Sequence, residues 1–263
     1  MNLLLVERRE LGEDGLGADV VVLRDRRAEH LRKVLKVEVG QELKVGIVGG
    51  LQGRGTVRAV DGDAVELQVD VPAGPAPRPD VDLIVGLPRP QALHRVLQTA
   101  AVMGVARLDL VKSWRVEKSF FQSPSLADDN VARQLLLGAE QGRNTFLPEV
   151  RTQKLLVPFV RGLEDEGKTL RLIAHPEAEA TLEDLVEPFL GNPSVGPAGR
   201  FLIAIGPEGG WIDREVQTFG EEGFLPVYLG PWILKVENAV TAVLAQLEMV
   251  RRRSVPDMDR SGS

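Results

Sequence analysis

The chain has 263 residues, 43% of them hydrophobic, and a formal net charge of −6 at pH 7. Such a composition can bury the core of one large domain or two ordinary ones, which excludes a disordered chain. Cysteine is absent and the three histidines lie far apart, so we expect no disulfide, no thiolate nucleophile and no metal site. The acidic total argues weakly against a nucleic-acid partner unless basic residues gather in one region.

No apolar run approaches the length of about 18 residues that a membrane-spanning helix needs. The start of the chain, MNLLLVERRE, has a short apolar run followed by charged residues, unlike a secretory signal peptide. We therefore expect a cytoplasmic protein that has no membrane partner.

The first part of the chain combines a basic segment with short strands. The segment RDRRAEHLRKVLK is either a solvated helix face or a positive patch for RNA, and its cations are Arg24, Arg26, Arg27, Arg32, Lys33 and Lys36. The stretch 42–71 alternates apolar and polar residues and is interrupted by glycines at 49, 50, 53 and 62, which predicts short antiparallel strands of a small β-barrel. We place this domain at 1–73, followed by a stiff proline-rich linker, VPAGPAPRPD.

Beyond the linker, strand and helix patterns alternate. Strands are predicted over 81–87, 107–113, 169–177, 201–206 and 225–230, and helices over 92–105, 130–142 and 236–253. Alternating βα units indicate a mostly parallel sheet with helices on both faces. We assign 81–252 to this second domain and expect 253–263 to be a flexible tail.

Three loops follow strands of this sheet, at His175-Pro176-Glu177, Gly206 to Trp211 and Gly230 to Lys235. Ligands bind at such carboxyl ends of parallel strands. The middle loop, GPEGG, lacks the Lys-Ser/Thr ending of a P-loop and the G-x-G-x-x-G spacing of dinucleotide sites, so phosphate is a poor ligand for it. The Glu208 carboxylate would suit a cationic or hydroxyl-rich ligand. Taken alone, a Gly-rich turn between strand and helix is more often ordinary turn chemistry than a ligand site.

The two glycine-proline loops together indicate a protein family more specifically than either loop alone. IGPEGG (205–210), followed about twenty residues later by LGPWILKVE (229–237), resembles the paired motifs of the RsmE family, ribosomal RNA uridine-N3 methyltransferases of the SPOUT superfamily. HLRKVLKVEVGQEL (30–43) is similar to the start of that family's PUA-like barrel, and GLPRPQALHRVLQTAAVMGV (86–105) to its opening strand and helix. AEQGRN (139–144) resembles its Glu-Gln-x-x-Arg signature. The likeness covers nearly the whole chain in the family's order.

The resemblance implies an α/β fold with a SPOUT trefoil-knot methyltransferase domain after a PUA-like β-barrel, the last strand and helix threading through a loop of the preceding chain. It implies S-adenosylmethionine as cofactor and 16S rRNA of the small ribosomal subunit as partner. A homodimer is also implied, for which the stripe Val240, Val243, Leu244 and Leu247 offers an interface or else core packing. The implied cofactor-binding residues are Ala174, His175, Ile205, Gly206, Pro207, Glu208, Gly209, Gly210, Leu229, Gly230, Ile233 and Leu234.

A sulfonium cation agrees with the position of Glu208, although a hydrogen bond to neighbouring backbone explains this carboxylate equally well. His175 is expected to line the cofactor pocket, not to act as the catalyst.

Methyl transfer to N3 of uridine requires removal of the N3 proton and alignment of the methyl group. The candidates are Arg143, Lys235 and Glu237. Arg143 could stabilise a uridine anion, bind a phosphate or cap a helix. Lys235 keeps the charge of the family's arginine without its bidentate fork. Glu237 could be a base or a substrate contact, and a carboxylate is favourable at a helix start in any case.

Some positions depart from the family's pattern LGPRILRTETA, namely Trp232, Lys235, Val236 and Asn238. Trp232 could stack on a base or merely fill space. Ile212 stands where the family has Ser or Thr, which leaves Asp213 as the expected helix cap. Two alternatives therefore stay open, a non-catalytic or altered-specificity SPOUT RNA-binding protein and a nucleotide-cofactor oxidoreductase. The missing G-x-G-x-x-G counts against the latter.

Overall fold

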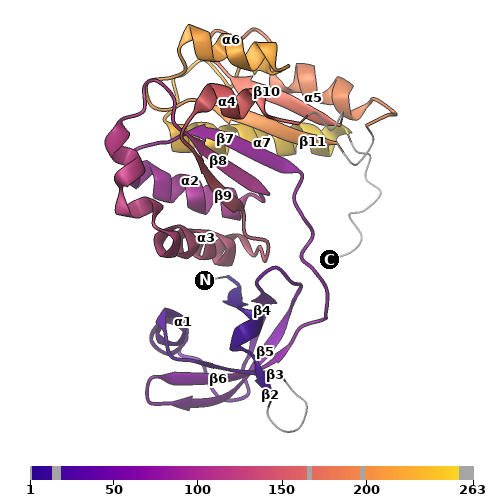
Figure 1. Cartoon of the computed structure of the whole chain (residues 1–263). Helices are drawn as coiled ribbons and strands as arrows, with labels where there is room; N and C mark the ends of the chain where they lie inside the picture. Colours follow the sequence, from indigo (N-terminus) through magenta and orange to yellow (C-terminus); the bar gives the residue numbers. More distant parts are fainter. Residues whose placement is uncertain (1, 14–18, 165–167, 196–198, 255–263) are drawn as a thin grey trace. The chain divides into compact units, whose positions relative to one another are not determined.

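A computed structural model describes residues 2–13, 19–164, 168–195 and 199–254 (Figure 1). The chain divides into two compact units, the first made of Met1–Arg78 and Leu135–Leu147, the second of Pro79–Gln134 and Pro148–Ser263. Most of the predicted tail, 253–263, lies outside the described residues. Of the helices within the described ranges, none combines the length and the apolar character that crossing a membrane requires.

The first unit is a curled six-stranded sheet with the order β1-β4-β5-β6-β3-β2. Its strands are β1 (Leu4–Val6), β2 (Gly12–Glu13), β3 (Asp19–Leu23), β4 (Glu42–Ile47), β5 (Gln52–Asp61) and β6 (Ala64–Asp70). Pairing is antiparallel except between β1 and β4. Alternate residues of the strands, such as Val45, Val57 and Leu67, face a buried core. The glycine at 62 forms a turn as predicted, with φ of +54°.

Gly53, in contrast, does not interrupt the pattern. It lies inside β5, where a Cβ atom would stand 2.2 Å from the carbonyl oxygen of Asp70. The glycine is therefore needed for the close approach of two strands, not for a turn. After β3 the basic segment forms the helix α1 (Arg26–His30), which continues as a π-helical turn over Leu31–Leu35.

The segment Leu135–Leu147 belongs to the first unit although it lies far along the chain. The Glu140 carbonyl accepts hydrogen bonds from the backbone N–H groups of Asn2 and Leu3 at 3.2 and 3.1 Å. The Thr145 hydroxyl donates to the Gly50 carbonyl at 2.6 Å. These bonds attach the end of the helix α3 (Asp128–Gly142) to the sheet of the first unit.

The second unit is a parallel six-stranded sheet with the order β12-β10-β11-β7-β8-β9. Its strands are β7 (Val81–Gly86), β8 (Arg107–Val111), β9 (Glu149–Gln153), β10 (Thr169–Ala174), β11 (Arg200–Ile205) and β12 (Leu225–Val227). Its helices are α2 (Pro90–Val102), α4 (Leu156–Arg161), α5 (Leu182–Leu190), α6 (Asp213–Glu221) and α7 (Val236–Ser254), with 3₁₀ turns at Lys118–Gln122 and Pro124–Leu126. The predicted parallel sheet is confirmed, and the threading of its last strand and helix stays a prediction.

Both faces of this sheet are buried. On one face, Ile84, Ile173 and Leu202 pack against residues of α4 and α6, among them Val160 and Phe219. The intervening strand residues are also buried, and α7 packs against β11 as well as against α2 and α5. A strand covered on both faces needs mainly apolar residues, which is why these strands are mostly apolar in the sequence, with one buried charged residue in each of β7, β8 and β10.

The packing of α7 decides between the two interpretations of its apolar stripe, dimer interface and core packing. Val240, Val243, Leu244 and Leu247 are at most 4% exposed, because α7 contacts α2, α5 and β11 of its own chain. The apolar stripe is therefore core packing of the second unit. It leaves the expected homodimer without the interface that the stripe offered.

Candidate functional site

The GPEGG loop follows β11 and has a shape that its glycines and proline impose. A Cβ atom on Gly206 would stand 3.2 Å from the Cα atom of Gly210, because the loop folds back on itself. Gly210 has φ of +71°, and its N–H donates to the Pro207 carbonyl at 2.8 Å. Pro207 packs so closely on Gly86, the last residue of β7, that a Cβ atom there would lie 2.5 Å from the Pro207 Cδ atom.

The Glu208 carboxylate is exposed and has a partner in the chain. Its Oε1 atom accepts a hydrogen bond from the backbone N–H of Arg89 at 3.0 Å. Arg89 immediately precedes the first residue of α2, where a negative charge is favourable. This contact supports the second of the two roles expected for Glu208, a hydrogen bond to backbone, and it joins the loops that follow β7 and β11.

Glu215 connects two further loops. This buried carboxylate accepts the backbone N–H of Trp114 at Oε1, 2.8 Å away, and that of Ile212 at Oε2, 3.0 Å away. Ile212 is the residue before α6, and its side chain cannot accept a hydrogen bond. The expectation that Asp213 caps this helix is therefore wrong: Asp213 is the first helical residue, and Glu215 satisfies the helix start. A glutamate three residues after the cap is half of a capping box, and this signal could have identified Glu215.

The loops after β10 and β12 lie side by side. The His175 N–H donates to the Val227 carbonyl at 3.1 Å, and the Tyr228 N–H donates to the Ala180 carbonyl at 2.8 Å. The Nδ1 atom of His175 accepts the N–H of Glu177 at 3.3 Å, so the ring proton of a neutral imidazole lies on Nε2.

The β12 loop is anchored at one end and open at the other. The Leu229 carbonyl accepts a hydrogen bond from the Gln246 side chain of α7 at 2.9 Å. Gly230 has φ of +140°, and the position of a Cβ atom there has no neighbour within 4 Å. The Ile233 side chain is 83% exposed. This loop therefore presents backbone and apolar side chains to the exterior of the unit.

The three loops meet at one edge of the sheet because β12, β10 and β11 are adjacent and parallel. All of the predicted cofactor residues lie on these loops or on the last residues of their strands. Three carboxylates, Glu177, Glu179 and Glu208, accompany one cation, Lys235, on the loops. Backbone amides, apolar side chains and this acidic balance suit a cationic nucleoside better than a phosphate-rich ligand.

The three predicted catalytic residues fall into different units. Lys235 is exposed immediately before α7, and Glu237 in the first turn of that helix is 9% exposed. The Oε1 atom of Glu237 lies 3.0 Å from Nη1 of Arg95 on α2, a partner that the sequence did not indicate. Arg143 belongs to the first unit, so the described contacts bring together Lys235 and Glu237 but not Arg143.

Arg143 has the geometry of a helix terminus. Its φ of +55° is left-handed, and it follows directly after α3. The next N–H, that of Asn144, donates to the Ala139 carbonyl at 2.9 Å, and the Arg143 carbonyl accepts from Gln52 at 2.7 Å. The capping role that we left open is thus observed for the backbone, while the side chain is exposed.

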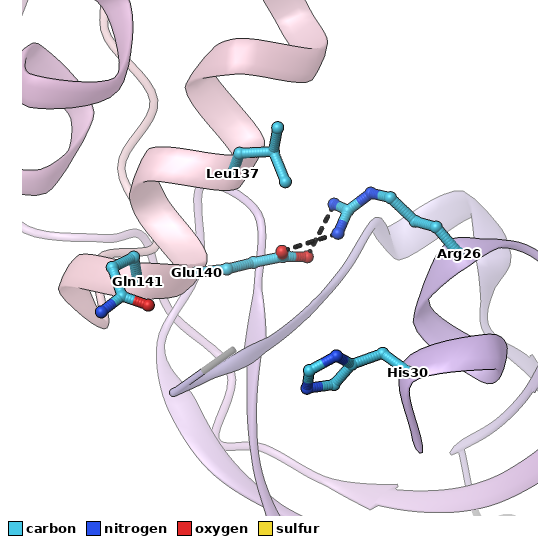
Figure 2. Close-up of a pocket in the computed structure, with 5 residues that line it drawn as sticks. All are labelled: Arg26, His30, Leu137, Glu140 and Gln141. Carbon is cyan, nitrogen blue, oxygen red and sulfur yellow. Dashed lines mark hydrogen bonds and ion pairs between the residues drawn. The ribbon is translucent and has the colours of Figure 1, made fainter. Parts of the chain in front are cut away.

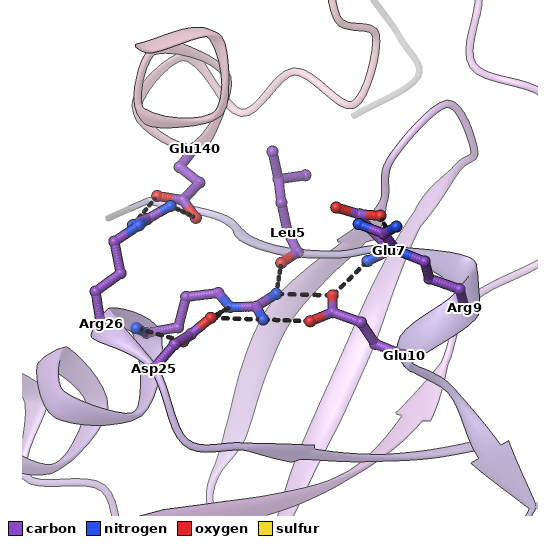
Figure 3. Close-up of polar contacts among 8 residues, drawn as sticks. Leu5, Glu7, Arg9, Glu10, Asp25, Arg26 and Glu140 are labelled. Carbon is purple, nitrogen blue, oxygen red and sulfur yellow. Dashed lines mark hydrogen bonds and ion pairs between the residues drawn. The ribbon is translucent and has the colours of Figure 1, made fainter. Parts of the chain in front are cut away.

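The basic segment is extensively paired within the first unit. Arg27 is the clearest case, since its side chain is 12% exposed and donates to the Leu5 carbonyl at 2.8 Å and to the carboxylates of Glu10 and Asp25. Figure 3 labels these three partners. The hydrogen bond from Arg27 lowers the pKa of Glu10, and these two carboxylates raise the pKa of Arg27 against the opposing effect of burial. Arg27 therefore stabilises the unit, which corrects its assignment as an RNA contact.

Arg26 also has a structural partner, in a pocket of about 300 Å³. Its guanidinium donates to both carboxylate oxygens of the buried Glu140, at 2.8 and 2.9 Å. Figure 2 shows these two hydrogen bonds between Arg26 and Glu140, with His30, Leu137 and Gln141 on the other walls of the pocket. The glutamate of the AEQGRN motif, Glu140, thus attaches the end of α3 to α1. One residue separates Gln141 from the next arginine, one fewer than in the Glu-Gln-x-x-Arg pattern.

Of the remaining predicted RNA contacts, Arg24, Lys33 and Lys36 are exposed and Arg32 is half-buried. Arg24 pairs with Asp63 at 3.1 Å and Lys33 with Glu29 at 2.7 Å, both on the surface. Arg32 donates to the Gly62 carbonyl, and Lys36 is exposed in a left-handed conformation. Surface ion pairs of this kind contribute little and can exchange for a phosphate.

Comparisons with known proteins agree with this geometry. Residues 75–248 match the family model of the RNA methyltransferase domain. Ribosomal RNA small subunit methyltransferase E 1 of Borreliella burgdorferi is 24% identical over 92% of this chain and 95% of its own length. The methyltransferase E of Treponema pallidum is 27% identical over 93% and 90%.

Solved structures show the same fold. The methyltransferase E of Neisseria gonorrhoeae, bound to S-adenosyl methionine, superposes with a TM-score of 0.73 at 22% identity, covering 95% of this chain and 98% of that one. A Legionella pneumophila methyltransferase, also bound to this cofactor, gives 0.72 at 22% identity over 95% and 97%. Because the family model covers more than half of the chain, this protein belongs to the RNA methyltransferase family, and its resemblance to the RsmE members is confirmed.

Proposed function

We propose that this protein transfers a methyl group from S-adenosylmethionine to N3 of a uridine in 16S rRNA of the small ribosomal subunit. The observation that supports this most strongly is the similarity to small-subunit methyltransferases over about nine-tenths of both chains. The paired loop motifs of that family stand at one edge of the parallel sheet. The similar structure from Neisseria gonorrhoeae holds the same cofactor.

The three loops suit S-adenosylmethionine chemically. The cofactor supplies an activated methyl group on a cationic sulfonium when it is bound. Backbone groups of the GPEGG loop and of Leu229 and Gly230 would hold adenine and ribose, with Ile233 and Leu234 as apolar walls. The loop carboxylates, Glu177 among them, favour a cation at this edge.

For the acceptor, we assign roles to the residues at the start of α7. Lys235 is exposed, so its ammonium can stabilise the negative charge that develops on the uracil ring as the N3 proton leaves. The Glu237 carboxylate is held by Arg95 at 3.0 Å, which fixes its position for accepting that proton or for orienting the base. Arg143, exposed at the end of α3, is proposed as a contact to the RNA backbone.

RNA binding by the first unit is assigned to the exposed Arg24, Lys33 and Lys36 and to the half-buried Arg32. We retain the two-domain division at 1–73 and 81–252 and a cytoplasmic location as proposals. A homodimer is proposed from the family resemblance. The exposed Ile233 and Trp232 give it support that the buried α7 stripe cannot.

The test combines cofactor binding with methyl transfer. Purified protein should bind S-adenosylmethionine in calorimetry and transfer labelled methyl groups to small subunits from cells that lack the modification, but not to large subunits. A Lys235→Ala variant should keep its cofactor affinity and lose transfer. Binding of the cofactor without transfer to any small-subunit RNA would favour the non-catalytic alternative, to which the departures at Trp232, Val236 and Asn238 already point.

A further inference from the structure

One large aromatic side chain near the cofactor loops has no packing role. Trp114 follows β8, and its side chain is 81% exposed. Trp211, by comparison, is 6% exposed in the core of the same unit. An indole left in water forgoes the stabilisation that its burial would give, so its exposure suggests a partner that is absent from the isolated chain.

The backbone beneath this indole is fixed. The Trp114 backbone N–H donates to the buried Glu215 carboxylate at 2.8 Å. Ser113 and Val116, the first and last residues of the turn that contains Trp114, are at most 6% exposed. The Val116 N–H donates to the Ser113 carbonyl at 3.2 Å and closes the turn. An exposed side chain on a backbone held in this way is presented in one place, as binding residues are.

The indole is also next to the GPEGG loop. The residue that follows it, Arg115, donates a hydrogen bond to the Gly209 carbonyl and lies over Gly209, where a Cβ atom would be 3.0 Å from the Arg115 Cδ atom. Glu215 meanwhile joins Trp114 to the residue before α6. The residue after Trp114 thus contacts the loop that we propose binds the methyl donor, and Glu215 links the Trp114 backbone to the residue after that loop.

The reaction requires an aromatic surface at such a place. N3 lies on the Watson–Crick edge of uracil, so the target uridine must be unpaired and unstacked before N3 can be reached. Unstacking the uridine has a free-energy cost, which stacking of the base on an aromatic side chain offsets in part. Cations near Trp114 in the chain, Lys112, Arg115 and Lys118, outnumber the single carboxylate of Glu117 and favour a phosphate backbone.

We propose that Trp114 is a stacking surface for an unpaired base of the substrate RNA, at the target uridine or beside it. The inference rests on the proposed function. It assigns Trp114 to substrate binding and leaves cofactor binding to the three loops. Tryptophan stacks on any base, so the residue would contribute affinity more than sequence discrimination.

Steady-state kinetics of a Trp114→Ala variant on small subunits test the proposal. We expect kcat/KM for the RNA to fall about 10- to 100-fold, the loss of one stacked base, mainly through a higher KM. Cofactor affinity in calorimetry should be unchanged. A Trp114→Phe variant should recover most of the loss, since it keeps an aromatic face. The matched control is Leu155→Ala, which removes another exposed apolar side chain (66%) after the neighbouring strand β9 and should behave as wild type.

Two outcomes would overturn the proposal. One is a wild-type KM for RNA in the folded Trp114→Ala variant. The other is a loss of activity accompanied by dissociation in sedimentation, which would make Trp114 a contact to a second copy of the chain.

A separate measurement uses a Trp232→Phe protein, in which a uridine-rich single-stranded RNA should quench the fluorescence emission of Trp114. Quenching without any methyl transfer by the wild type would refute the proposed reaction and support stacking, whereas transfer without quenching would refute stacking alone.

Discussion

Replacing Glu215 with glutamine should loosen the loops after β8 and β11. The carboxylate accepts one backbone N–H at each oxygen, from Trp114 and from Ile212, and it is 5% exposed. Glutamine keeps one acceptor and places an NH₂ group against the other N–H. The variant therefore loses one hydrogen bond to a charged acceptor, about 1.5–3 kcal/mol, and leaves a buried donor unsatisfied. Relief from burying a charge offsets part of this, so we expect a net loss of about 2 kcal/mol.

Urea unfolding and calorimetry should measure the effect of Glu215→Gln. The midpoint should fall with an unchanged slope, and affinity for S-adenosylmethionine should drop because the GPEGG loop is less well held. Glu221→Gln is the matched control, since this residue is exposed on the same helix. A Glu215→Gln protein with wild-type stability and cofactor affinity would show that the two hydrogen bonds do not organise the site.

Three further predictions concern other parts of the chain. Gly209→Val should abolish cofactor binding in calorimetry while circular dichroism stays native, because its side chain would displace the exposed Arg115 from above the loop and keep a ligand away from the loop backbone. Arg95→Ala should lower kcat and leave cofactor affinity intact, since Glu237 loses the partner that positions it, and Arg95→Lys should restore part of the rate. Because Arg27 lowers the pKa of Glu10 below its ordinary value of 4.5, the pair stabilises the fold above that pH and loses its effect as the pH falls through the lowered pKa. An Arg27→Met protein should therefore be less stable by about 2 kcal/mol at neutral pH and show a weaker acid dependence in unfolding experiments.

The strands of the second unit could be predicted because their burial shows in the apolar residues of each strand itself. β7, β10 and β11 are covered on both faces, so their apolar runs needed no knowledge of their neighbours. β1 has only three residues, and the polar β9, EVRTQ, is an edge strand that pairs on one side. Short or polar strands of this kind are defined by their partners, which the sequence does not show.

The candidate site also has features that the sequence predicts and features that depend on residues far apart in the chain. The glycines and prolines of the two loop motifs restrict their own backbone, so these loops could be recognised from the sequence. The Trp114 partner of Glu215 and the Arg95 partner of Glu237 lie 101 and 142 residues away in the chain, and the pairing of Arg27 with Glu10 also depends on tertiary structure. The α7 stripe has the same spacing whether its own chain or another subunit covers it, and only the fold decides between them.

The most direct test of the proposed reaction is mass spectrometry of 16S rRNA from small subunits that lack the modification, before and after incubation with this protein and S-adenosylmethionine. We expect 3-methyluridine to appear at one position, with a reverse-transcription stop at the same nucleotide, because the methyl group blocks the Watson–Crick edge. The absence of 3-methyluridine from RNA treated with cofactor-binding protein would contradict it.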